Sequence, residues 1–256
     1  FQYEVKNGLT AVASPNPLLV DVATLTITIN GANDSPTLDL NTVDASTSNY
    51  ATSFTEGGSA VSLLTASGVN IADVDSTTFE SLRLTYDKTK FTDTLAGASA
   101  EILKVTGATS GGSLVMGTLT NGGTGTVVLN SVTYRYTVSE SGNNVTLTFE
   151  KLVSSSAVEM TKAETEALLD ALSYQNTAEN PTGGSLRVFS LSVVDGGTAS
   201  AQNGVGVLPS NIATSTITVS AAVTATSGAS VSFTGYPEVI VGWNFGYHSY
   251  LLAAGV

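Results

Sequence analysis

Short runs in which apolar and polar residues alternate recur along most of this 256-residue chain. Phe1, Tyr3 and Val5, for example, alternate with polar neighbours, which is the period of a strand that buries one face. Gly-rich segments such as 107–112 and 121–125 separate several of the runs and are typical of turns. The pattern predicts strands at 1–5, 22–29, 60–64, 81–86, 126–129, 131–138, 144–149, 186–194 and 212–219. We therefore expect an all-β sandwich.

One segment departs from the strand pattern. Thr161 is followed three residues later by Glu164, the spacing of a capping box at a helix start. Three leucines, Leu168, Leu169 and Leu172, then fall on one face of a helical period. The sequence thus predicts a single short helix over 161–172, which we expect to bridge the two sheets and to have no catalytic role.

Two parts of the chain match each other. Residues 1–11 align with 189–199, and residues 22–29 align with 212–219. Residues 1–11 and 22–29 are interpreted as the last two strands of a sandwich domain, and 189–199 and 212–219 as a second copy of the same two strands. We therefore expect 1–34 to hold the final strands and linker of a preceding repeat, or donor strands, and 35–222 to form one complete repeat. A chain that begins in mid-strand without Met is interpreted as processed or as part of a longer protein.

Within the terminal segment 223–256, residues 229–256 match nothing else in the chain. Val239, Val241, Trp243, Phe245 and Tyr247 alternate with other residues and predict a strand with an aromatic face. The segment is expected to form a terminal hairpin or to open a next unit. Alternatively, this hairpin or the strands in 1–34 could pair with another subunit, because an unpaired strand edge accepts an added strand.

Charge and composition narrow the function classes. The chain has 21 acidic and nine basic residues, a net charge of −12, which argues against nucleic acid or an anionic membrane surface as a partner and favours cations. No apolar stretch is long enough to predict a membrane-spanning helix. There is no cysteine, which excludes disulfides, a thiol nucleophile and a thiolate zinc site.

Nothing in the sequence predicts catalysis. His248 is the only histidine, and it lies in the predicted terminal strand. The carboxylates fall in turns and junctions and not in a pattern typical of acid–base pairs. The Gly107–Gly112 loop lacks the Lys of a phosphate-binding loop and precedes no helix pattern. We therefore expect a non-enzymatic protein.

The acidic residues do suggest a calcium site. Asn33 and Asp34 follow a predicted strand, Glu56 lies near the start of the next unit, and Asp73 and Asp75 form an Asp-x-Asp pair. Calcium takes six to eight oxygen ligands from carboxylates, amides and backbone carbonyls. A linker Asn-Asp, a Glu and an Asp-x-Asp that converge at a domain junction would suffice. The alternative is a solvated turn at Asp73 and Asp75 and an Asx-turn at Asn33-Asp34.

The order of several motifs resembles the cadherin-like, VCBS-like tandem repeats of large bacterial RTX and biofilm adhesins. The motifs are Gly31–Pro36, Thr55–Gly57, Ile71–Ser76, Leu172–Thr177 and Val193–Gly196. The resemblance implies an immunoglobulin/cadherin-like Greek-key sandwich, Ca²⁺ at repeat junctions and secretion to the bacterial cell surface. It would make Asn33 and Asp34 linker ligands, Glu56, Asp73 and Asp75 base and mid-domain acids, and Asp195 a further candidate ligand. The chain departs from the pattern at 221–224, which carries no acid.

Three hypotheses follow. The first is a structural and adhesive repeat of an extracellular surface protein, stiffened by calcium at its junction with a neighbouring repeat and in contact with a host or matrix surface. The second is a subunit of an extracellular filament or sheath, joined to identical subunits by strand pairing. The third is a carbohydrate- or protein-binding module that uses the aromatic region 236–250.

Overall fold

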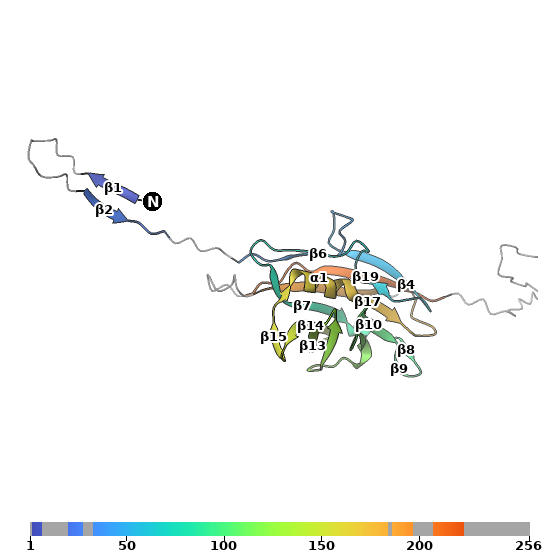
Figure 1. Cartoon of the computed structure of the whole chain (residues 1–256). Coiled ribbons are helices and arrows are strands. Elements are labelled where there is room, and N and C mark those ends of the chain that lie inside the picture. Colours follow the sequence, from blue (N-terminus) through green and yellow to red (C-terminus); the bar gives the residue numbers. More distant parts are fainter. Residues whose placement is uncertain (1, 7–19, 28–32, 184–185, 197–206, 223–256) are drawn as a thin grey trace, which may run out of the picture.

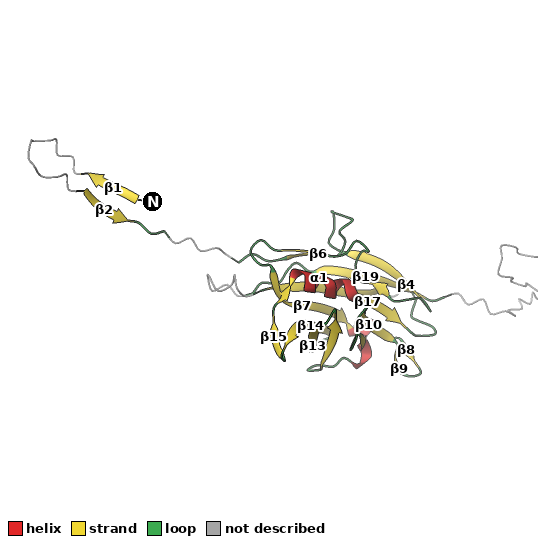
Figure 2. Ribbon diagram, in the orientation of Figure 1, coloured by secondary structure: helices red, strands yellow, loops and turns green. Residues whose placement is uncertain are grey.

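The computed structural model describes residues 2–6, 20–27, 33–183, 186–196 and 207–222 (Figure 1). Most of these residues form strands, accompanied by one α-helix, α1 (Lys162–Ala171), and two short 3₁₀ helices (Figure 2). The predicted all-β class with one short helix is confirmed at this level. None of the helices in the described ranges is long and apolar enough to cross a membrane.

The largest sheet has nine strands, with the order β12-β13-β14-β7-β18-β19-β4, and with β15 paired to β14 and β16 to β7. All of its pairs are antiparallel except β19 with β4, which is parallel. Its strands are β4 (Tyr50–Thr55), β7 (Thr78–Asp87), β12 (Thr124–Leu129), β13 (Val132–Ser141), β14 (Asn144–Val153), β15 (Ser156–Val158), β16 (Met160–Thr161), β18 (Leu186–Asp195) and β19 (Ala213–Ser220).

A second sheet has four strands in the order β11-β10-β17-β5, which are Ser113–Val115, Glu101–Val105, Leu172–Asn176 and Val61–Ser62. The remaining strands pair in twos: β1 (Gln2–Lys6) with β2 (Val20–Thr24), β3 (Thr37–Asp39) with β6 (Asn70–Ala72), and β8 (Thr94–Leu95) with β9 (Ala98–Ser99). The 3₁₀ helices are η1 (Lys88–Lys90) and η2 (Met116–Thr118).

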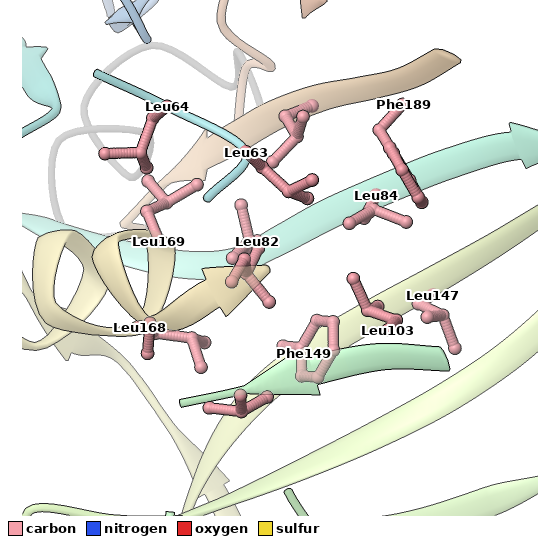
Figure 3. Close-up of a cluster of buried hydrophobic side chains, with 14 of the residues drawn as sticks. Leu63, Leu64, Leu82, Leu84, Leu103, Leu147, Phe149, Leu168, Leu169 and Phe189 are labelled. Carbon is pink, nitrogen blue, oxygen red and sulfur yellow. The ribbon is translucent and has the colours of Figure 1, made fainter. Parts of the chain in front are cut away.

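The two larger sheets pack face to face around one apolar core. The ring of Tyr174 in β17 meets the ring of Phe54 in β4 edge-on, with centroids 5.6 Å apart, and lies 6.2 Å from that of Phe189 in β18. Leucines from both sheets fill the space between them, and Leu168 and Leu169 of α1 join this cluster (Figure 3). This arrangement is consistent with a β-sandwich.

Helix α1 begins as the sequence predicts. The Thr161 side chain accepts the Glu164 backbone N–H, and the Glu164 carboxylate accepts the Thr161 N–H, which completes the capping box. Its end was predicted wrongly, because Leu172 is the first residue of β17 and not part of the helix. Leu172 pairs with Val105 of β10, so it reaches the core from a strand.

The matched segments have the same strand register. Gln2 pairs with Thr24 and Tyr3 with Ala23, and both β1 and β2 pair only with each other among the described residues. The aligned residues in the second copy pair likewise, Ser190 with Thr214 and Leu191 with Ala213. The sequence match between 1–29 and 189–219 is therefore accompanied by a matching antiparallel ladder. The predicted terminal hairpin at 223–256 lies outside the described residues.

Candidate metal site

Five of the six predicted ligand residues are joined by hydrogen bonds at one end of the sandwich. Asn33 donates through Nδ2 to Oδ2 of Asp195, at 2.5 Å and across 162 positions of sequence. The Asp34 backbone N–H donates to Oδ2 of Asp75 at 3.1 Å. The Asp75 N–H in turn donates to Oδ1 of Asp73 at 3.1 Å. The structure thus brings together the linker Asn-Asp, the Asp-x-Asp pair and Asp195.

The strand order explains this convergence. Asp73 and Asp75 lie in the turn between β6 and β7, and β6 pairs with β3, which follows Asn33 and Asp34. Asp195 is the last residue of β18, and it pairs with Phe79 at the beginning of β7 after a register shift. The linker, the β6–β7 turn and the end of β18 therefore meet at the same edge of the molecule.

Asp195 is fully buried and its side chain is held on two sides. Oδ1 accepts the backbone N–H of Leu208 at 2.6 Å, while Oδ2 accepts from Asn33. The Asp195 N–H also donates to the Leu208 carbonyl at 3.1 Å. Asp195 therefore binds both the segment that leads into β19 and the linker residue Asn33.

Asp73 combines features of a turn and of an ion ligand. Its Oδ1 accepts the N–H groups of Asp75 and Ser76, which is the Asx-turn expected of the alternative interpretation. Its Oδ2 is buried and has no hydrogen-bond partner. Desolvation, together with the charge of Asp75, raises the pKa of Asp73 above its ordinary value. A buried carboxylate oxygen without a donor is unfavourable unless a proton or a cation compensates it.

The four carboxylates of this group, Asp34, Asp73, Asp75 and Asp195, are in no ion pair within the part of the chain that the structure describes. Neighbouring like charges repel each other, and solvent, protonation or a bound cation can offset that repulsion. The local electrostatics consequently favour a cation.

The group is not arranged as a closed coordination shell. In the part of the chain that the structure describes, no three His, Cys, Asp or Glu side chains lie together in positions that would hold a metal ion. The carboxylates of Asp73, Asp75 and Asp195 accept hydrogen bonds from backbone N–H groups and, for Asp195, from Asn33 instead. Ion binding would require some of these hydrogen bonds to be exchanged for metal–oxygen contacts, with backbone carbonyls and amide oxygens completing the shell.

Glu56 does not belong to this group, so its expected place at the same junction is wrong. Its N–H donates to the Ser220 carbonyl, and its Oε2 accepts the Ala222 N–H, both at 2.9 Å. The β18–β19 ladder has two ends, and Asp195 lies beyond one of them. Ser220 lies beyond the other end. Since a strand rises about 3.3 Å per residue, the ten-residue β18 separates the two ends by about 30 Å.

Sequence reasoning missed Asn211, whose side chain binds the backbone of β3, the strand that follows Asn33 and Asp34. Its Oδ1 accepts the Leu38 N–H at 2.7 Å, and its Nδ2 donates to the Leu38 carbonyl at 2.9 Å. One side chain thus pairs with β3 as a neighbouring strand would. A lone Asn in a loop carries no sequence signal for such a role.

Comparisons with protein-family models, with curated proteins and with solved structures found no match to this chain. The resemblance to cadherin-like adhesin repeats, with the location and activity it implies, therefore stays a prediction.

Proposed function

We propose that this chain is a non-enzymatic structural and adhesive segment of a bacterial extracellular surface protein, stiffened by calcium where the N-terminal linker enters the sandwich. The convergence of Asn33, Asp34, Asp73, Asp75 and Asp195 carries the proposal. In particular, the buried Oδ2 of Asp73 has no hydrogen-bond donor in a group that already holds excess negative charge.

Calcium suits these donors better than other common metals. All side-chain donors in the group are carboxylate or amide oxygens, which hard cations prefer. Zinc and copper favour thiolate and imidazole ligands, and the chain has no Cys and a single His, which is remote in sequence. Magnesium demands near-octahedral geometry and keeps several waters, whereas calcium tolerates an irregular shell.

Calcium binding here would restrict the junction. Asn33 and Asp34 belong to the end of the linker, while Asp73, Asp75 and Asp195 belong to the sandwich. An ion shared by these residues ties the linker to the domain, and its removal leaves four carboxylates that repel each other. The matched ladders β1–β2 and β18–β19 support the interpretation of 1–34 as the ending of a preceding repeat with the same immunoglobulin/cadherin-like Greek-key topology.

The opposite end of the sandwich is built differently. Glu56 hydrogen-bonds to the Ala222 backbone, and the exit segment from Ala221 to Thr224 contains no acid. We therefore restrict the calcium proposal to the N-terminal junction, and we propose that the Glu56 carboxylate holds the exit segment by its hydrogen bond to the Ala222 backbone.

Calorimetric titration of the metal-free chain with Ca²⁺ tests the proposal. We expect saturable binding that Asp73→Asn weakens at least about tenfold, because a charged ligand is removed from the shell. Glu56→Gln is the matched control and should leave the affinity within about twofold of the parent. Absence of binding, or equal losses from both variants, would contradict the assignment of the site.

A further inference from the structure

A second surface feature lies away from the metal site, beside the loop that joins β10 to β11. A crevice of about 560 Å³ is lined by Ser59, Ala60, Lys104, Val105 and residues 106–113. None of these residues is acidic, although the chain carries 21 acidic residues and a net charge of −12. The lining therefore carries one cation and no carboxylate, which favours an anionic ligand over a cationic one.

The wall of this pocket is fixed by backbone contacts with β12. Thr109 donates its N–H to the Val128 carbonyl at 2.8 Å, and the Val128 N–H donates to the Ser110 carbonyl at 3.0 Å. Gly111 has a φ of +67°, and a Cβ there would lie 1.9 Å from the Thr126 carbonyl oxygen. Only glycine fits at this position. The loop is consequently preformed, which lowers the entropy cost of binding a ligand.

Lys104 supplies the positive charge. Its Nζ donates to Oε1 of Gln175 at 3.0 Å, and among the described residues no carboxylate forms an ion pair with it. An ammonium group has three N–H donors, so two remain for a ligand. Gln175 holds the side chain in place, so Lys104 is positioned before a ligand arrives.

The rest of the lining limits the ligand chemistry. The hydroxyls of Ser59, Ser110 and Ser113 make no side-chain hydrogen bond with other described residues, although each can donate and accept. No aromatic ring lines the pocket, so the stacking platform typical of neutral-sugar binding is missing. One ammonium and several hydroxyls instead fit a polyhydroxylated molecule with a carboxylate that can pair with the ammonium.

We propose that this pocket binds the carboxylate of an acidic saccharide, with Lys104 pairing with the carboxylate and the serine hydroxyls contacting the sugar hydroxyls. The inference is independent of the calcium site. It would give the chain a ligand-binding activity on the side of the sandwich, in addition to its role as a stiff segment.

The test is a titration of the intact, isotope-labelled chain with trigalacturonic acid, followed by amide chemical shifts. Galactotriose is the matched neutral ligand. Metal is removed beforehand with a chelating resin, because a soluble polycarboxylate chelator would compete for Lys104. We expect saturable shifts at the amides of residues 107–113, at least about tenfold weaker binding by Lys104→Gln, and no saturation by galactotriose.

Lys90→Gln is the control for general charge effects, since Lys90 is exposed in η1 and does not line the pocket. The affinity of Lys90→Gln for trigalacturonic acid should stay within about twofold of that of the parent chain. An unchanged melting temperature would show that Lys104→Gln still folds. The proposal is overturned if trigalacturonic acid shows no saturable binding, if galactotriose binds equally well, or if the two lysine variants lose affinity equally.

Discussion

Asn33 donates a hydrogen bond from Nδ2 to the fully buried Oδ2 of Asp195, at 2.5 Å. This contact joins a residue at the end of the N-terminal linker to the last residue of β18. Because Asp195 also accepts the Leu208 N–H, one carboxylate connects the start of the sandwich to the segment before its final strand. Asn33 is therefore coupled to the core and not only to the surface turn of Asp73 and Asp75.

Replacing Asp195 should destabilise the sandwich even without metal. Asp195→Ala leaves the Leu208 N–H and the Asn33 amide without their acceptor in a buried site, and each such loss typically costs about 1–3 kcal/mol. We expect the free energy of unfolding in urea to fall by about 2 kcal/mol or more. Asp34→Ala is the control, because the Asp34 side chain is exposed, and it should change the value by about 0.5 kcal/mol or less. Equal effects from the two variants would contradict this role of Asp195.

Asn211 should hold β3 against the rest of the domain. Asn211→Ala removes both hydrogen bonds to the Leu38 backbone, so we expect a loss of about 1–2 kcal/mol in stability. Hydrogen exchange at the Leu38 amide should also become markedly faster than in the parent chain. The neighbouring Ile212 is 67% exposed, so Ile212→Ala should leave that exchange rate unchanged. A Leu38 amide that stays protected from exchange in Asn211→Ala would show that the two hydrogen bonds of Asn211 do not hold β3 in place.

A buried ionic cluster should make stability depend on pH. Arg187 and Glu101 are fully inaccessible to solvent, and Arg187 donates to both Glu101 and Asp93. Burial raises the pKa of Glu101, and this effect exceeds the lowering by hydrogen bonds from Arg187 and Tyr174. For Asp93, burial also acts to raise the pKa, but hydrogen bonds from Thr182 and Asn176 and the charge of Arg187 outweigh it, so its pKa is lowered.

The two pKa shifts have opposite effects on stability as the pH falls. As the pH falls through the raised pKa of Glu101, the native state takes up a proton that the unfolded chain does not, so the stability rises. Asp93 stabilises the native state as an ionised carboxylate. Below the usual aspartate pKa of about 3.9, this stabilisation is lost as the pH falls towards the lowered pKa of Asp93.

Glu101→Gln should isolate the first effect. Urea unfolding of the metal-free chain between about pH 7 and pH 4.5 should show a smaller gain in stability on acidification in Glu101→Gln than in the parent. Glu80→Gln is the control, because Glu80 is exposed on β7, and its pH dependence should follow that of the parent. A parent-like gain in Glu101→Gln would mean that Glu101 does not titrate as described.

The strands with clear alternation could be predicted from the sequence, and strand β10 shows why others could not. Its residues alternate in burial, but the first buried position is Glu101, a charged residue that hides the apolar pattern. Its burial depends on Arg187, which lies 86 positions away and is itself buried. A local sequence pattern cannot predict this pairing, because Glu101 and Arg187 are far apart in sequence. Each charge can be buried in the core only when the other is present.

The candidate site was predictable in part for a similar reason. The types of residue and their order indicated oxygen ligands at a junction, and five of the six residues do meet there. The pattern could not show at which end of the sandwich Glu56 lies, since that depends on the parallel pairing of β4 with β19. Parallel neighbours place the end of β4 beside Ser220, far from Asp195.

The most direct test of the central claim measures how freely the linker moves. The chain has no cysteine, so Lys6→Cys in β1 and Thr218→Cys in β19 allow two spin labels to be attached at defined positions. Electron paramagnetic resonance then gives the distribution of distances between the labels. We predict a broad distribution in the metal-free chain and a narrow one with saturating Ca²⁺, and no narrowing when Asp73→Asn is added. A distribution whose width is the same with and without Ca²⁺ would contradict a calcium-stiffened junction.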